Sequence, residues 1–231
     1  MSSFISPSEL PGPGCWTRNT LEVLAKALNA SYFFAEGNRA RRVGLLSRRP
    51  ILKRQSHHPF PFIWRNFIEV KIESSSGKPL HIFGVHPLAN LGLPFEIWRY
   101  WEARYVTASA NTDTTEPCLI TGDFNAIAPG DKIVAATMPD WLRFMIWIQG
   151  KRVYHFSMSA YFQAGFTDCF RHLHPNDPGF TLPPPNPNAR LDYVLVNDAL
   201  KPYLRKCWVV GEPEAVLKAS DHYPVVAEFE L

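Results

Sequence analysis

The sequence predicts an α+β fold in one domain that combines short strands with a few packing helices. Hydrophobic residues make up 46% of the 231 residues and aromatic residues 13%, enough for a substantial core. A segment with helical periodicity, 95–110, lies between two apolar segments suited to buried strands, 80–85 and 118–120. No repeat or linker divides the chain, so we expect one domain over residues 1–231.

Charge and cysteine usage limit the classes of protein that need to be considered. The net charge of +3 is mildly basic, which suits an anionic substrate without identifying nucleic acid. The cysteines are far apart and form no CxxC pair, as expected for reduced thiols in a cytoplasmic protein. No apolar run approaches the ~18 residues of a membrane span, and Met1–Cys15 lacks the pattern of a signal peptide. The sequence leaves the oligomeric state open.

The beginning of the chain predicts an irregular segment, one helix and two strands. Residues 1–18 are rich in proline, glycine and serine, which is typical of irregular structure. Leucines on one face predict a helix over 21–29. The apolar segments 31–35 and 43–47 predict strands. Seven basic residues fall between Arg39 and Arg54, and such a run is either a solvated face or a rim that binds phosphate.

A hairpin and a helix are predicted next. Segments 67–73 and 80–85 flank a serine- and glycine-rich turn, as the two strands of a hairpin do. The helix over 95–110 has several residues that we expect to pack on a sheet. These residues are Ile97, Trp98, Trp101, Tyr105 and Ala108.

The second half of the chain predicts another helix and three strands. The dense apolar segment 141–148 predicts a helix with its aromatic side chains in the core, and an exposed apolar flap is the alternative. The proline-rich loop at 183–187 is of the kind that often carries function. Strands are expected over 190–196, 208–210 and 223–229.

Several polar residues occur at or near the ends of these strands, where a core would not select them. They are His86, Asp123, Asn125, Asp192, Asp221 and His222. Asp123 and Asn125 are two residues apart, so in an extended chain their side chains point the same way. On its own, the segment Gly122–Asn125 is more typical of an ordinary turn.

The chemistry of these residue types points to phosphate esters. An aspartate inside a strand, such as Asp192, is costly unless it is paired, and a histidine partner would gain a raised pKa that suits contact with phosphate. Asp123 and Asp221 supply the oxygen ligands that Mg²⁺ or Mn²⁺ prefers. Together they indicate metal-assisted attack of water on a phosphodiester or phosphomonoester.

The sequence also resembles a known family over nearly all of its length after the first twenty residues. Five segments in order carry the resemblance: Gly44–Pro50, Gly84–His86, Thr121–Asn125, Arg190–Tyr193 and Ser220–Val225. They are similar to motifs of the endonuclease/exonuclease/phosphatase superfamily, which includes DNase I-like and exonuclease III-like enzymes. The resemblance implies a four-layer α/β/β/α sandwich, with two mixed, mostly antiparallel sheets and outer helices.

The resemblance further implies roles for the polar residues. Asp123 matches the base or water-orienting aspartate, and Asn125 matches the asparagine that binds phosphate. His86 matches the histidine that stabilises phosphoryl oxygens. Asp192 matches the partner of the last histidine, His222, which faces the scissile phosphate. The implied substrate is a phosphate ester, with DNA, RNA, an inositol phosphate, a phospholipid headgroup or a nucleotide as alternatives.

The metal ligands are where the chain departs from the family. Asp221 matches one ligand, but the family's opening strand and the strand that ends in its principal metal-binding glutamate have too little room before residue 21. Glu9 is the best remaining candidate for that glutamate, and a surface residue at a frayed terminus is the alternative. The departure leaves two functions open: a Mg²⁺-dependent phosphoesterase, possibly a nuclease, or a non-catalytic binding protein that keeps the fold.

Overall fold

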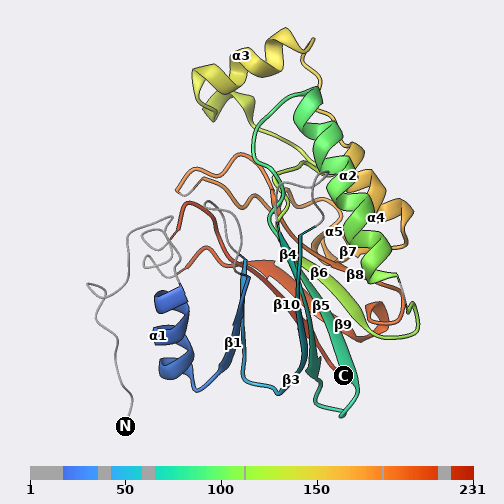
Figure 1. The fold of residues 1–231 in the computed structure, drawn as a ribbon. Coiled ribbons are helices and arrows are strands. Elements are labelled where there is room, and N and C mark those ends of the chain that lie inside the picture. Colours follow the sequence, from blue (N-terminus) through green and yellow to red (C-terminus); the bar gives the residue numbers. More distant parts are fainter. Residues whose placement is uncertain (1–17, 36–42, 59–65, 112, 184, 213–219) are drawn as a thin grey trace.

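The computed structural model describes residues 18–35, 43–58, 66–111, 113–183, 185–212 and 220–231 (Figure 1). Glu9 and the arginines at 39–42 lie outside the described residues. Among the helices that are described, none combines the length and the apolar character needed to cross a membrane.

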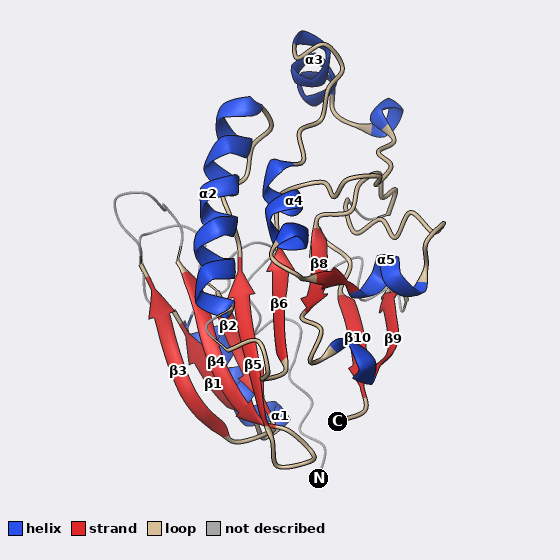
Figure 2. Ribbon diagram, turned by 90° about the vertical axis from the view of Figure 1, so that its right-hand side faces the viewer, coloured by secondary structure: helices blue, strands red, loops and turns tan. Residues whose placement is uncertain are grey.

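A six-stranded mixed sheet forms the centre of the molecule (Figure 2). In spatial order its strands are β3 (Ile51–His57), β4 (Phe67–Glu73), β5 (Pro79–Val85), β6 (Cys118–Asp123), β8 (Asp192–Val196) and β7 (Thr167–Asp168). Only the β5–β6 pair is parallel, and the other neighbours are antiparallel. Because β5 and β6 run in the same direction, the residues that follow them emerge at the same edge of the sheet.

Two small antiparallel sheets cover one face of the central sheet. The first pairs β1 (Ser31–Phe34) with β2 (Gly44–Ser47), and the second pairs β9 (Leu204–Val209) with β10 (Val225–Phe229). Apolar residues of β4 pack under the first pair, and those of β6 and β8 pack under the second. Register places these residues on one face of the central sheet. Helix α1 (Arg18–Leu28) packs on β1 and β2.

The opposite face of the central sheet is covered by α2 (Leu93–Ala110) and α4 (Phe156–Gln163), which lie side by side (Figure 1). The predicted sandwich of sheets and outer helices is therefore confirmed. The structure differs from the predicted sandwich in one respect: in the described part of the chain, the second sheet consists of two separate pairs of strands. The remaining elements are η2 (Ala135–Thr137), α3 (Asp140–Ile148), α5 (Cys169–Leu173) and η3 (Lys201–Tyr203).

Helix α2 forms where the sequence predicts it, but it buries a different face. Ile97, Trp101 and Tyr105 are largely exposed, whereas Arg99 and Ala103 are buried. The physical reason is ion pairing: Arg99 Nη2 lies 2.9 Å from a carboxylate oxygen of Glu96, which is buried on the same side of the helix. A charged side chain that is paired can be buried, and hydrophobic periodicity does not detect this.

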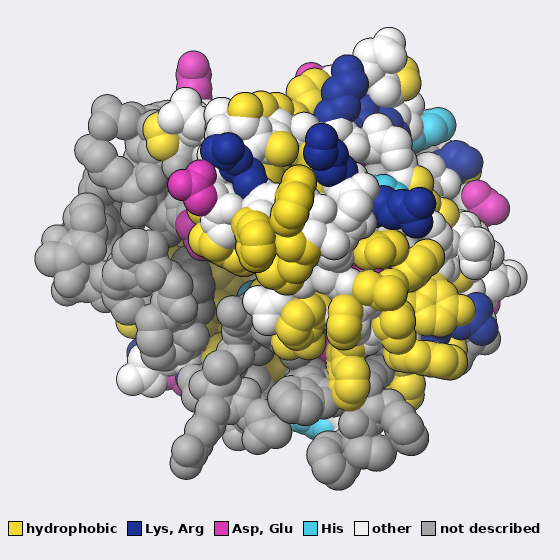
Figure 3. All heavy atoms as spheres, turned by 90° about the horizontal axis from the view of Figure 1, so that it is seen from above, with side chains coloured by type: hydrophobic (Ala, Val, Ile, Leu, Met, Phe, Trp, Pro, Cys, Tyr) yellow, Lys and Arg dark blue, Asp and Glu magenta, His cyan; other side chains and the backbone are white. Residues whose placement is uncertain are grey.

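One further expectation from the sequence needs correction. The aromatic residues of α3 were expected in the core, but Trp141, Phe144 and Trp147 are among the most exposed large side chains. Viewed from above, hydrophobic side chains gather on this face of the molecule (Figure 3). Strands β3 and β7 and helices α4 and α5 were not predicted, and the strands and helices predicted elsewhere in the described residues are present within a few residues of their expected bounds.

Candidate active site

The central sheet brings three of the predicted polar residues to one edge. His86 follows β5, Asp123 ends β6 and Asp192 begins β8. The register of β6 and β8 places Asp123 directly opposite Asp192. The site is thus built from residues far apart in the sequence by the pairing of neighbouring strands, as strand-end positions predicted.

The backbone at Gly122 allows β5 and β6 to approach closely just before Asp123. Gly122 has φ +142°, and a Cβ atom at this position would lie 2.0 Å from the carbonyl oxygen of Val85. Only glycine adopts this conformation readily. After the strand, Asn125 has φ +49°, so the chain turns sharply here, as a turn interpretation of the segment also predicts.

Hydrogen bonds hold this turn in place. The backbone N–H of Asn125 donates to Asp123 Oδ1 over 2.8 Å, and the Asn125 side-chain amide donates to the carbonyl oxygen of Pro87 over 3.1 Å. Asp123 Oδ2 lies 3.5 Å from His86 Nε2. Asp123 therefore contacts both the turn that carries Asn125 and the histidine at the end of β5.

His222 completes the group from the segment just before β10. Its Nδ1 lies 2.7 Å from Asp192 Oδ2, and both side chains are partly buried. Burial of the imidazole opposes protonation, but the hydrogen bond and charge of Asp192, together with the charges of Asp123 and Asp221, outweigh burial and raise the pKa of His222 to about 9. The ring is then a cation at neutral pH and presents its other N–H as a donor.

Asp123, Asp192 and His222 each offer a ligand atom, and these atoms lie within 4.8 Å of one another. Carboxylate oxygens are the donors that Mg²⁺ and Mn²⁺ prefer, so the two aspartates fit such an ion. Without a metal, the raised pKa of His222 leaves the ring as a hydrogen-bond donor for an anion.

The predicted metal ligands are less closely grouped. Asp221 is exposed, is not a member of the three-residue group, and has its Oδ1 3.5 Å from Ser220 Oγ. Its charge nevertheless reaches the ring of His222, where it contributes to the raised pKa. Since Glu9 lies outside the described residues, the structure brings together His86, Asp123, Asn125, Asp192 and His222, with Asp221 at their border.

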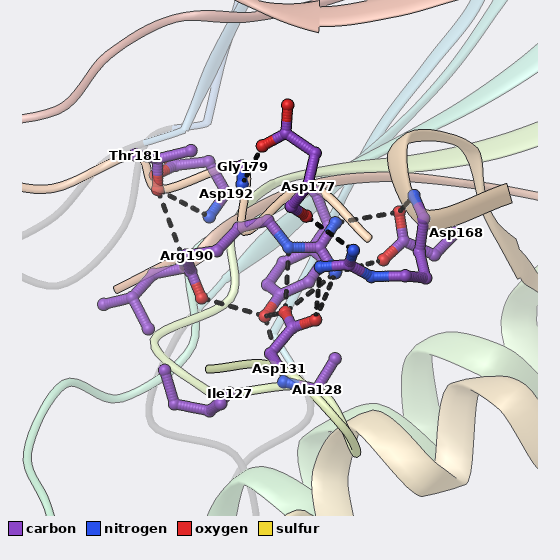
Figure 4. A network of polar contacts seen from close by, with 12 residues as sticks. Ile127, Ala128, Asp131, Asp168, Asp177, Gly179, Thr181, Arg190 and Asp192 are labelled. Carbon is purple, nitrogen blue, oxygen red and sulfur yellow. Dashed lines mark hydrogen bonds and ion pairs between the residues drawn. The ribbon is translucent and has the colours of Figure 1, made fainter. Parts of the chain in front are cut away.

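A buried charge network that sequence reasoning missed supports this edge of the sheet (Figure 4). Arg190 is 1% exposed, and its Nε donates to Asp131 Oδ2 over 2.8 Å. Its Nη1 donates to Asp168 Oδ1 over 3.1 Å. The Tyr193 hydroxyl accepts from the backbone N–H of Ala128 over 3.0 Å. These contacts fix the loop that follows Asn125.

The sequence contained one signal for this network. Arg190 belongs to the Arg190–Tyr193 segment that resembles a family motif, but the pattern did not reveal its partners. Burial opposes the charge on the guanidinium, yet the charges of Asp168 and Asp131 and the hydrogen bond to Asp168 prevail and raise the pKa of Arg190. The residue is therefore a permanent buried cation.

The basic residues of the chain's first third do not all flank the site. Arg48 and Arg49 precede β3, whose first residue, Ile51, is opposite Ile72 of β4. That end of the sheet is opposite to the one at which His86 lies. A solvated surface is the better interpretation of these two arginines.

Comparison with known proteins identifies the family. Residues 9–222 match the model of the Endonuclease/Exonuclease/phosphatase family, so the chain belongs to this family, whose members are phosphoric ester hydrolases. A search of curated proteins gave no match.

Solved structures share the fold at low sequence identity. The 3′ phosphatase NExo from Neisseria, bound to a product DNA hairpin, has a TM-score of 0.70 and 18% identity, covering 98% of this chain and 86% of that one. An AP endonuclease from Archaeoglobus fulgidus has a TM-score of 0.70 and 18% identity, covering 94% and 86%. D. rerio TDP2 with a single-strand DNA product has a TM-score of 0.64 and 16% identity, covering 94% and 83%.

Proposed function

We propose that the chain hydrolyses a phosphoric ester at the edge of the sheet where Asp123, Asp192 and His222 meet, with Mg²⁺ as its metal and Mn²⁺ as an alternative. The observation that carries the proposal is the 2.7 Å contact between Asp192 and His222 beside a second carboxylate, that of Asp123. A protonated imidazole next to carboxylates combines a donor for phosphoryl oxygens with an acceptor for the proton of water.

In this proposal each residue acts on water or on the phosphoryl group. Asp123 orients the attacking water and accepts its proton, since its carboxylate is fixed by the N–H of Asn125. His222 donates a hydrogen bond to an oxygen on which negative charge increases, and Asp192 holds the ring in the orientation that allows this. The Asn125 side chain and His86 bind the remaining phosphoryl oxygens.

The metal would be held by carboxylate oxygens, of which those of Asp123 and Asp192 are closely grouped. Asp221 and Glu9 are the further proposed ligands. When bound, a divalent cation polarises the phosphoryl oxygens and reduces the charge that the protein must stabilise. The family has phosphate esters as substrates, and we propose nucleic acid as one candidate because proteins with the same fold are named as bound to DNA.

The activity is tested with bis-(p-nitrophenyl) phosphate in the presence of Mg²⁺ or Mn²⁺ and after chelation. We expect metal-dependent hydrolysis that falls by about 10²–10⁴-fold in Asp123→Asn and in His222→Gln. Asp198→Asn is the matched control, because that aspartate is 86% exposed and follows β8 at the end opposite to Asp192. Circular dichroism of each variant shows whether its fold is retained.

The results separate the candidate functions. Variants that keep full activity while the unchanged chain is active would overturn the assigned roles. A folded chain that hydrolyses no ester with either metal would favour the non-catalytic binding protein. Plasmid nicking at several salt concentrations tests DNA as the substrate, since contacts to phosphates weaken steeply as salt increases.

A further inference from the structure

A pocket of about 260 Å³ lies beside the candidate active site. One wall is the turn after β6, including Asn125, whose backbone N–H binds Asp123. Another part of the lining comes from α3 and the residue that follows it, including Trp141 and Gln149. Because Asn125 belongs to both, a group in this pocket is adjacent to a phosphate bound at the site. We name this cavity the amide pocket.

The interior of the amide pocket is apolar, but four carboxamides line it: Asn90, Asn125, Gln149 and Asn188. Gln149 Oε1 is buried and accepts no hydrogen bond from any described residue, although the Nε2 of the same side chain donates to the carbonyl oxygen of Met145 over 2.8 Å. A buried acceptor without a donor is unfavourable. A ligand that donates a hydrogen bond to Gln149 Oε1 would therefore bind more favourably than an apolar ligand.

Asn188 is a second amide in the lining. It is 4% exposed, and its backbone groups bond to Val134 and Leu182. An alkyl chain in the pocket would leave the oxygen of Gln149 unpaired and would use neither amide, so a ligand with donors and acceptors along an edge fits better.

The charges of the pocket favour a ligand whose neutral part enters the pocket while its phosphate stays outside. Glu96 and Arg99 line the wall, but they pair with each other over 2.9 Å and are buried. Arg152 also lines the pocket and is exposed, and no described acidic residue pairs with it. A cation at the rim attracts an anion to the entrance without drawing it into the apolar interior.

We propose that the amide pocket binds the nucleobase of a nucleotide whose phosphate lies at Asp123 and His222; this inference rests on the proposed function. A nucleobase is planar, neutral and carries donors and acceptors on its edges, and Trp141 provides an aromatic face for stacking. The volume of the cavity is below the ~300 Å³ at which pockets for drug-sized ligands begin, which suits one ring system. The base comes from a free nucleotide or from an unpaired strand, and both have the same chemistry.

The test is calorimetric binding to the full chain, which does not depend on catalysis. AMP, GMP, CMP and UMP are compared with ribose 5-phosphate, which lacks a base, and with octyl phosphate, which replaces the base by an alkyl chain. We expect at least one nucleotide to bind about tenfold or more tightly than ribose 5-phosphate, as base stacking on an aromatic residue provides. Tightest binding of octyl phosphate would overturn the proposal, and equal affinities for all nucleotides and ribose 5-phosphate would exclude a free nucleotide as the source of the base.

Two tryptophans of α3 offer a matched pair of variants. Trp141 and Trp147 are both 62% exposed, but only Trp141 lines the pocket. We expect Trp141→Ala to remove the preference for the nucleotide over ribose 5-phosphate and Trp147→Ala to keep it. A preference that survives in Trp141→Ala, or that is lost equally in both variants, contradicts the assignment.

A four-nucleotide single strand distinguishes the two sources of the base. If a mononucleotide shows the preference, a free nucleotide is sufficient; if only the strand shows it, relative to an abasic strand, the source is nucleic acid. A preference in neither overturns the inference. If the chain binds the base but hydrolyses no ester, the proposed function is wrong and the assignment of the pocket stands. If the chain hydrolyses esters but shows no preference for a base, the proposed function stands and the assignment of the pocket is wrong.

Discussion

Replacing Arg190 by methionine removes the cation from the buried network and keeps most of the side-chain volume. The guanidinium contacts Asp131 and Asp168, and the three side chains are between 1% and 6% exposed. Loss of one partner from a buried ion pair costs about 3–5 kcal/mol, because a charge is left uncompensated. Here Arg171 still lies 2.9 Å from Asp131 Oδ1, which compensates part of the charge. We therefore expect a loss of about 4 kcal/mol in the free energy of unfolding.

The loss is measured by urea unfolding followed by circular dichroism, and by the thermal midpoint. For a chain of this size, about 4 kcal/mol corresponds to a lower Tm by roughly 8–16 °C. Arg143→Met is the control, because Arg143 pairs with Asp140 at the surface, where such pairs contribute little. The double variant with Asp168→Asn should recover part of the stability, since it removes one of the uncompensated charges.

The reasoning is refuted if Arg190→Met unfolds with a free energy within about 1 kcal/mol of the unchanged chain, a loss typical of an ordinary substitution. Failure of the double variant to recover any stability would show that lost packing dominates. In that case the contacts of the guanidinium with Phe170 and Tyr193, whose ring centroids lie 5.5 Å and 4.5 Å from its carbon, would account for the loss.

Three further predictions concern the site and the acid stability of the sheet. Gly122→Ala should lower the free energy of unfolding by at least about 2 kcal/mol, because its Cβ would overlap the Val85 carbonyl 2.0 Å away; unchanged urea unfolding would contradict this. In metal-free Asp192→Asn, an NMR titration should find the pKa of His222 well below about 9, since its main partner is uncharged and burial then has more weight; an unchanged pKa would refute the pairing. Burial raises the pKa of Glu69, but hydrogen bonds from a lysine and two histidines outweigh burial and lower it to about 2. The ionised Glu69 therefore stabilises the fold above its unfolded pKa near 4.5, and this stabilisation is lost as the pH falls towards 2. The free energy of unfolding of the unchanged chain should exceed that of Glu69→Gln by about 3 kcal/mol less at the low end of this window than at the high end. Parallel plots of unfolding free energy against pH for the two chains would exclude this.

The fold was predictable where burial and periodicity agree. The hairpin of β4 and β5 and the helix α2 give clear signals because one face of each is in the core. Strand β3 gives no such signal, because it is an edge strand of the sheet and most of its residues are exposed. Where both faces of a strand meet solvent, apolar and polar residues have no reason to alternate. The face of α2 was misassigned for a related reason, because the pairing of Glu96 with Arg99 allows charged residues to be buried.

The candidate site was predictable from residue type and position at strand ends, which placed Asp123 and Asp192 correctly at one edge. The supporting contacts were not, because they depend on distance in space rather than on local pattern. Arg190 and Asp131 are 59 positions apart. Likewise the exposed aromatic face of α3 has the composition of a core segment, and only the packing of the chain around it shows that Trp141 lines a pocket.

The contact between Asp192 and His222 joins two layers of the molecule, since Asp192 lies on the central sheet and His222 precedes β10 of a separate pair of strands. Thr181, which is fully buried, connects the same two layers. Its carbonyl oxygen accepts from the backbone N–H of Tyr223 over 2.7 Å, and its hydroxyl oxygen accepts from the N–H of Leu191 over 3.1 Å. Thr181 thus holds both Leu191, which precedes Asp192, and Tyr223, which follows His222. The start of the proline-rich loop is therefore bonded to the two segments that orient His222, the proposed hydrogen-bond donor to phosphate.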